Sequence, residues 1–248
     1  MANWNDPQPR TGFGASPSLN GDALGQVQVD QGLRRHMLSI YNYMASGVLL
    51  TGIVALLTAN SPAMLQVIFG GGILTWVIML APFGFVLAMG LGVNRFSTGT
   101  LQALFWGYAA LMGLSLSSIF LVYTGGSIAK TFFATAGAFA GLSLVGYTTK
   151  RDLSGMGAFM TMGLIGIILA SIFNLFFKSS GLDLAISILG VLIFAGLTAW
   201  DTQKLKLMYY QVEGSDFAGK AVVLGALTLY LDFINMFLFL LRLFGDRR

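Results

Sequence analysis

The chain has 248 residues, of which 56% are hydrophobic and only 10% are charged. An average soluble domain has roughly 25% charged residues, so this chain has too little polar surface to coat a water-soluble globule. It has no cysteine, which excludes disulfides and thiolate metal sites. Its net charge of +4 comes from basic residues spread between the apolar segments, a distribution that favours anionic lipid headgroups over nucleic acid as a partner.

The first segment, residues 1–33, is rich in Gly, Pro, Gln, Asn and Asp and has no apolar periodicity. Such a composition predicts a disordered polar tail. A cleavable signal peptide is not expected, because the first long apolar run begins only after Arg34, Arg35 and His36. The remaining residues, 34–248, are predicted to form one transmembrane domain.

Seven continuously apolar runs follow, each close to the length of about 20 residues that crosses a hydrocarbon core about 30 Å thick. A helix satisfies its own backbone in lipid, whereas barrel strands would alternate apolar and polar residues. The sequence therefore predicts an all-α membrane protein with seven transmembrane helices and short connections. The runs are approximately 38–58, 72–92, 101–123, 128–147, 156–177, 184–204 and 221–243.

The basic residues near the ends of these runs predict the orientation, because such residues favour the cytoplasmic side. If the N-terminus is cytoplasmic, that side collects Arg34, Arg35, Arg95, Lys150, Arg151, Lys204, Lys206 and Lys220. The opposite side then holds Lys130, Lys178, Arg242, Arg247 and Arg248. The bias would be larger if the last segment were re-entrant, so a six-span alternative with a re-entrant seventh segment stays open.

Two carboxylates, Asp201 and Asp232, lie within the last two runs, where a charge is costly and usually marks a site inside the bundle. The polar turn at residues 213–216 lies close to the midpoint between them in the sequence, and both helices are expected to run up to it. They should therefore reach similar depths on adjacent antiparallel helices. Two carboxylates in contact in a low dielectric cannot both ionise cheaply, so we expect them to share a proton.

These polar residues also have purely structural interpretations. Asp201 could lie at the headgroup boundary and pair with Lys204 or Lys206 one turn away, an alternative that is weaker for Asp232, deep in its apolar run. Arg95, at the end of the second run, is as consistent with a cytoplasmic anchor as with a functional partner of Asp201.

Three further features favour packing roles over chemistry. Pro82 should kink the second helix. Asn174 and Asn235 are intramembrane amides, which more often join helices than bind ligands. His36, the single histidine, is expected at the membrane interface.

Four stretches carry a resemblance to a known family, and the last two together are highly specific. They are Gly113-Leu-Ser-Leu-Ser-Ser-Ile-Phe120, Gly146-Tyr-Thr-Thr-Lys-Arg-Asp-Leu-Ser-Gly155, Gly196-Leu-Thr-Ala-Trp-Asp-Thr-Gln203 and Ala226-Leu-Thr-Leu-Tyr-Leu-Asp-Phe-Ile-Asn235. The chain resembles the Bax inhibitor-1 family, also called the transmembrane Bax inhibitor motif family, in its bacterial branch. The resemblance covers nearly the whole chain after residue 33.

The resemblance implies a fold in which helix seven is central and surrounded by the other six. It implies a di-aspartyl pH sensor made by Asp201 and Asp232, and a basic residue, here Arg95, that latches onto the helix-six aspartate when the pore is closed. One departure is Trp200, where similar proteins more often have Tyr, so a hydrogen bond from that hydroxyl would be missing. The implied location is the bacterial inner membrane, with multiple passes and a cytoplasmic N-terminus.

The first functional hypothesis is a pH-sensitive calcium leak down its gradient, the activity that the resemblance implies. Calcium would be the permeant ion, with transient metal contacts at Asp201 and Asp232 and no resident cofactor. Calcium takes 6 to 8 oxygen ligands, so two aspartates alone supply too few, and selectivity for calcium is implied only by the resemblance.

Two other hypotheses compete with it. Some bacterial members of the family associate with a membrane-bound ATP-dependent protease and modulate it, and here the polar tail would be the contact. An intramembrane aspartyl protease is disfavoured, because the presenilin-like pattern has Gly before the second Asp and this chain has Leu231. The sequence has no zinc motif, nucleophile elbow or phosphate loop, so we predict a non-enzyme.

Overall fold

The computed structural model of the chain describes residues 21–248, with side chains from residue 31 onward. Within this range, seven helical segments are long and apolar enough to cross a membrane, which confirms the predicted all-α fold with seven spans. The helices are α1 (Gly21–Ala59), α2 (Pro62–Phe69), α3 (Ile73–Gly92), α4 (Thr98–Leu116), α5 (Ile119–Val122), α6 (Gly125–Thr148), α7 (Ser154–Phe177), α8 (Ser180–Val212) and α9 (Ala218–Phe244). The short helix α2 lies between the first two spans, and α4 continues into α5 within the third span.

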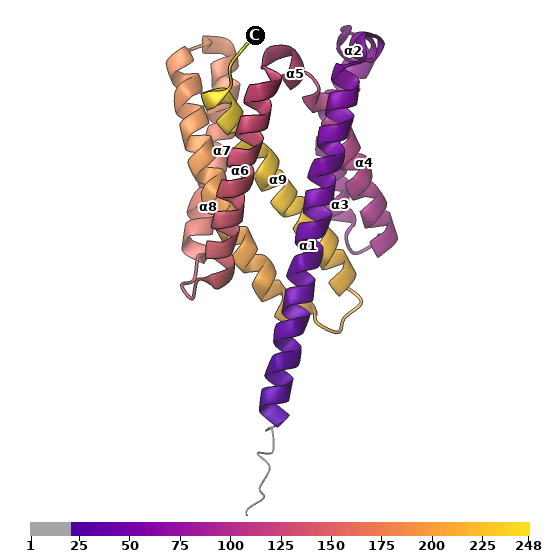
Figure 1. Ribbon diagram of the computed structural model, residues 1–248, viewed down its shortest axis with the longest axis vertical. Helices are drawn as coiled ribbons and strands as arrows, with labels where there is room; N and C mark the ends of the chain where they lie inside the picture. The colour runs from indigo at the N-terminus through magenta and orange to yellow at the C-terminus, as the bar shows by residue number, and fades with distance from the viewer. Residues whose placement is uncertain (1–20) are drawn as a thin grey trace, which may run out of the picture.

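Hydroxyl side chains fix several of the helix starts. Ser61, Ser97, Thr124 and Ser179 each accept a hydrogen bond from a backbone N–H in the first turn of the helix that follows. Such caps satisfy donors that have no partner inside the helix. The connections between spans can therefore be short, and successive spans run antiparallel (Figure 1).

The last helix crosses the whole bundle. Its far end is joined to the connection between α5 and α6, where Asp246 O accepts from Thr124 N at 3.0 Å and Val122 O accepts from Arg248 N at 3.0 Å. The C-terminus thus lies at the end of the bundle opposite to the start of α1 (Figure 1). The six-span alternative with a re-entrant seventh segment is not the arrangement in this structure.

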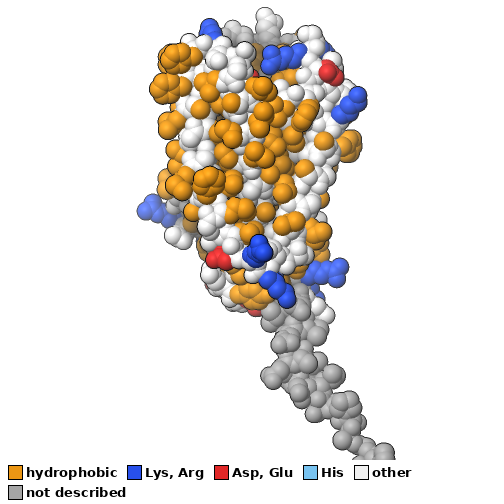
Figure 2. Space-filling model, turned by 90° about the vertical axis from the view of Figure 1, so that its left-hand side faces the viewer, with side chains coloured by type: hydrophobic (Ala, Val, Ile, Leu, Met, Phe, Trp, Pro, Cys, Tyr) orange, Lys and Arg blue, Asp and Glu red, His pale blue; other side chains and the backbone are white. Residues whose placement is uncertain are grey.

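Helix α9 is the predicted central helix seven. In its most apolar window of 18 residues 61% are buried, against 44% in α8 and 33% or less in the other spans. It packs against α1, α4, α6 and α8, while α3 packs mainly on α4 and α7 on α8. The outer surface is apolar, and on the face shown in Figure 2 hydrophobic side chains cover the middle while Lys and Arg lie near the two ends.

A chain of buried hydrogen bonds joins three spans. The Thr51 hydroxyl of α1 donates to the carbonyl oxygen of Ala109 in α4 at 2.7 Å and lies 2.7 Å from the Tyr230 hydroxyl of α9. A hydroxyl has one proton, so Thr51 accepts from Tyr230 while it donates to Ala109. All three residues are buried, so this chain fixes α1 and α4 against the central helix.

The structure differs from the sequence-based expectation at the start of α1. The helix begins at Gly21, so residues 21–33, which the sequence assigned to a disordered tail, are helical. The rest of the predicted tail, residues 1–20, lies outside the described residues. His36, expected at the interface, is buried against Tyr209, and its Nε2 has no hydrogen-bond partner in the part of the chain that the structure describes.

Candidate functional site: a carboxylate pair between the last two spans

The two predicted aspartates come together between the two most buried helices. Asp201 on α8 and Asp232 on α9 are 6% and 4% exposed. Helices α8 and α9 are joined by the tight turn at residues 213–217 and pack against each other along their length. Both side chains line one cavity of about 590 Å³.

The two carboxyl groups are close neighbours in the wall of this cavity. Two ionised carboxylates can only accept, so this contact becomes a hydrogen bond when one of them carries a proton. Asp232 Oδ2 is buried and has no hydrogen-bond partner among the described residues, so it is free to take part in such a bond. The geometry can therefore hold one proton between the two side chains, or a cation in its place.

Other oxygen atoms line the same cavity. Thr161 of α7 and Thr228 and Asn235 of α9 lie in its wall. Each donates its proton to a carbonyl four residues earlier in its own helix, at 2.9, 3.1 and 2.8 Å respectively. Their oxygens are left as acceptors. Together with the carboxylates they form an oxygen-rich region of the kind that hard cations prefer.

The cavity is covered on one side by Trp200, the residue before Asp201. The indole lies close to Gly157 of α7, where a Cβ would collide with the ring. The ammonium group of Lys204, three residues after Asp201, lies 5.0 Å from the centroid of the Trp200 ring. It is no ion-pair partner, because among described residues the single salt bridge lies elsewhere, between Arg242 and Asp183.

Arg95 is not brought to the pair. It is exposed, in the turn between α3 and α4, and forms no salt bridge within the described chain. This turn is held instead to the start of α9, because Lys220 Nζ donates to the carbonyl oxygen of Val93 at 3.0 Å. The latch between Arg95 and Asp201 that the family resemblance implies is therefore not formed in this arrangement.

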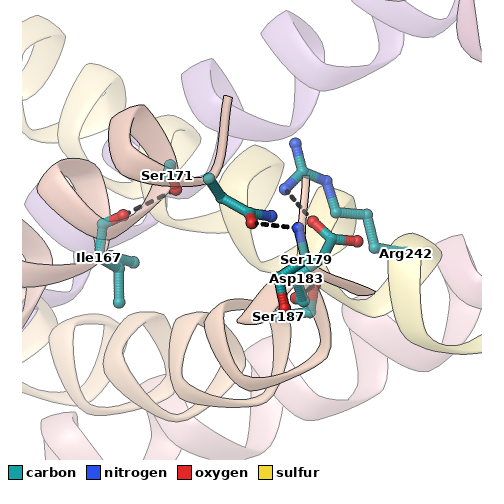
Figure 3. Close-up of polar contacts among 7 residues, drawn as sticks. Ile167, Ser171, Ser179, Asp183, Ser187 and Arg242 are labelled. Atoms are coloured by element: carbon teal, nitrogen blue, oxygen red, sulfur yellow. Dashed lines mark hydrogen bonds and ion pairs between the residues drawn. The ribbon is translucent and has the colours of Figure 1, made fainter. Parts of the chain in front are cut away.

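The sequence analysis missed a second charged pair, at the opposite end of the same two helices. Figure 3 shows Arg242 in the last turn of α9 pointing toward Asp183 in the first turn of α8, with 3.9 Å between Nη1 and Oδ1. The guanidinium also lies 5.7 Å from the ring centroid of Phe239, which lines the cavity. The sequence could have predicted this pair, because two antiparallel helices joined by one turn also bring their far ends together, and these ends carry Asp183 and Arg242.

Polar contacts order the connection before α8 as well. Asn174 Oδ1 accepts from the backbone N–H of Ser179 at 2.9 Å, which stabilises the turn after α7 where Lys178 has a left-handed φ of 48°. Asn174 thus closes a turn rather than joining two helices. Asn235, which bonds within its own helix, does not join helices either.

The fold and the site define a class: a helical membrane protein with seven spans and a buried carboxylate pair between the last two. In the described part of the chain, no group of three or more His, Cys, Asp and Glu side chains could hold a metal ion. Residues 33–248 match the profile of the family described as "Inhibitor of apoptosis-promoting Bax1", and the chain belongs to this family.

Relatives with similar sequences occur in several bacteria. The chain is 49% identical over 224 residues to the inner membrane protein YbhL of Escherichia coli K12, covering 90% of this chain and 96% of that one. It is 52% identical over 220 residues to the protein RP147 of Rickettsia prowazekii, covering 88% and 92%. A Caulobacter vibrioides protein is 48% identical over 232 residues, covering 90% and 92%.

Proposed function

We propose that this protein is a passive, pH-sensitive pathway for calcium ions across the bacterial inner membrane, with Asp201 and Asp232 as its proton sensor. The observation that carries the proposal is the placement of two neighbouring carboxyl groups in one cavity between the two most buried helices. Intramembrane acids are costly to retain, which supports a functional role over a packing role.

The chemistry of the pair links proton binding to cation binding. With one shared proton the pair carries a single negative charge, and the protonated carboxyl group donates a hydrogen bond to the other. Without that proton, two carboxylates repel each other in a low dielectric and attract a divalent cation. The oxygens of Asn235, Thr161 and Thr228 would supplement the carboxylate ligands, since calcium takes 6 to 8 oxygens.

The proposed location follows from the relatives and the charge distribution. The YbhL protein of Escherichia coli is named an inner membrane protein, which supports the same membrane for this chain. Arg34, Arg35, Lys150 and Lys220 all lie at the end of the bundle where α1 enters, which supports a cytoplasmic N-terminus by the distribution of basic residues.

Arg95 enters the proposal as a gating residue in a second arrangement. The turn that carries Arg95 would move toward α8, and the guanidinium would pair with Asp201, which forms no salt bridge among the described residues. The contact between Lys220 and Val93 would break in that movement. Arg95→Gln should then change the pH dependence of flux without abolishing flux.

The test is calcium flux into proteoliposomes across pH 5 to 8, with Asp201→Asn and Asp232→Asn beside the wild-type protein. Both variants should lose the pH dependence, because neither retains a carboxyl pair. Asp183→Asn is the matched control, since it removes a half-exposed acid outside the cavity from the same helix as Asp201, and it should keep the pH dependence. Unchanged pH-dependent flux in both pair variants would remove this mechanism.

A second function is supported by the length of α1. The helix begins at Gly21, whereas its membrane-spanning part begins at Gln31, and it projects beyond the bundle (Figure 1). We propose as the alternative that this arm, with the residues before it, contacts a membrane-bound ATP-dependent protease and modulates it. Deleting residues 2–30 should then abolish co-purification with the protease and leave calcium flux intact. Retained co-purification would exclude the arm as the contact.

A further inference from the structure

A groove runs between α1 and α6 on the side of the bundle away from the carboxylate pair. Its first part is a cavity of about 630 Å³ near the start of α1, lined among others by Arg34, Leu38 and Ala45 of α1 and by Ala140, Leu144 and Tyr147 of α6. Figure 1 shows α1 and α6 separated here, with α9 behind them. We call this cavity and its continuation the α1/α6 groove.

The groove continues along the next turns of the same two helices. A second cavity of about 320 Å³ is lined by residues of α1 from Val48 to Leu56 and of α6 from Gly125 to Phe133. Phe233 and Phe237 of α9 close it from inside. The two cavities together follow α1 over most of its membrane-spanning length.

The walls of the groove match hydrocarbon. Leu38 and Leu144 at the rim of the first cavity are 49% and 62% exposed, and Phe133 at the rim of the second is 73% exposed. These side chains face outward in a protein whose surroundings at this depth are lipid chains. A roomy apolar groove offers water few hydrogen-bond partners, so lipid chains are its natural filling.

The charge at the groove is confined to one end. Arg34 lines the first cavity. Lys206 is not part of the lining, but its Nζ donates at 2.8 Å to the carbonyl oxygen of Tyr147, a lining residue at the same end, and lies 5.1 Å from the Tyr147 ring centroid. The lining of the second cavity contains no charged residue. In the region whose side chains are described, residues 31–248, neither cation has an acidic salt-bridge partner.

We propose that the α1/α6 groove binds one anionic glycerophospholipid from the leaflet on the side where α1 enters the membrane. Its phosphate lies between Arg34 and Lys206, and an acyl chain follows α1 and α6 toward Phe233. A zwitterionic lipid fits the apolar walls equally well, but its own cation opposes the two basic side chains. The groove therefore selects the headgroup by charge and the leaflet by the position of that charge.

The experiment is native mass spectrometry of the full chain in a neutral detergent, titrated with phosphatidylglycerol or with phosphatidylcholine of the same acyl chains. The wild-type protein should retain phosphatidylglycerol more tightly. Each basic residue near a membrane surface contributes about fivefold to the binding of an anionic lipid, the equivalent of about 1 kcal/mol. Arg34→Gln and Lys206→Gln should each reduce the preference about fivefold and leave phosphatidylcholine binding unchanged.

Two further variants keep the test decisive. Arg35→Gln removes the neighbouring charge, which neither lines the groove nor, unlike Lys206, bonds to a residue that does, and should keep the preference. Ala140→Trp fills the first cavity from an exposed position and should reduce retention of both lipids. The proposal is overturned if the preference survives in the Arg34→Gln, Lys206→Gln double variant, or if inorganic phosphate competes as well as the lipid does. A change of oligomeric mass in Ala140→Trp would also overturn it, because a second copy would then occupy the groove.

Discussion

The hydrogen-bond chain from Tyr230 through Thr51 to Ala109 allows a quantitative test of how the central helix is held. Thr51→Val removes both bonds and leaves the Tyr230 hydroxyl, on a fully buried side chain, without an acceptor. A buried unsatisfied hydroxyl costs about 1–3 kcal/mol, and side-chain hydrogen bonds between membrane helices contribute about 0.6 kcal/mol on average and up to about 1.7. We therefore expect the free energy of unfolding to fall by about 2 kcal/mol.

Tyr230→Phe should cost less, about 0.5–1 kcal/mol, because Thr51 still donates to Ala109. In the double variant no hydroxyl is left without an acceptor, so its loss should be smaller than the sum of the two single losses. The expected coupling free energy is about 1 kcal/mol. Equilibrium unfolding in mixed micelles with increasing sodium dodecyl sulfate measures all four proteins.

Thr58→Val is the matched control, since it makes the same change on the same helix. The Thr58 hydroxyl is buried, 1% exposed, and has no hydrogen-bond partner among the described residues. Its removal should leave the stability unchanged or raise it. Additive losses at Thr51 and Tyr230, within about 0.3 kcal/mol, would refute the hydrogen-bond chain as a stabilising element.

Two further predictions concern other parts of the fold. A Cβ at Gly146 would collide with the carbonyl oxygen of Ala199, so Gly146→Leu should separate α6 from α8. This variant should shift or abolish the monodisperse peak in size-exclusion chromatography. Gly141→Leu is the control, because a Cβ there meets open space, and its peak should be unchanged. In the connection before α7, hydrogen bonds from Ser154 hold the pKa of Asp152 below its usual value. Asp152 therefore stays ionised to a lower pH than a free aspartate does. Ser154→Ala removes the side-chain bond, so the pKa of Asp152, measured by following its carboxyl group by NMR, should rise. An unchanged pKa would show that the Ser154 hydroxyl has no such effect.

The spans were readable from the sequence because lipid imposes a simple rule. Each of the seven apolar runs became a helical span, since a chain in hydrocarbon must satisfy its backbone within the same segment. The start of α1 was not readable. Residues 21–33 are too polar to signal a span, yet the helix continues through them to Gly21.

The closeness of Asp201 and Asp232 followed from one geometric fact, their similar distances along the chain from the turn at residues 213–217. Two helices that leave a tight turn side by side bring residues at equal distances to equal depths. Asp183 and Arg242 lie at the far ends of the same two helices, so similar reasoning would have placed them near each other, but an acid and a base near the membrane surface gave no reason to look for a pair.

What the sequence alone determined is the number of spans, their antiparallel order and the depth of the acids, because hydropathy and spacing act along the chain. What only the tertiary structure decided is which faces meet: the cavity shared by α7, α8 and α9, the distance of Arg95 from the pair, and the groove between α1 and α6. In lipid an outward and an inward apolar face have nearly the same composition. Helix rotation is therefore set by close packing and a few buried hydrogen bonds rather than by hydropathy.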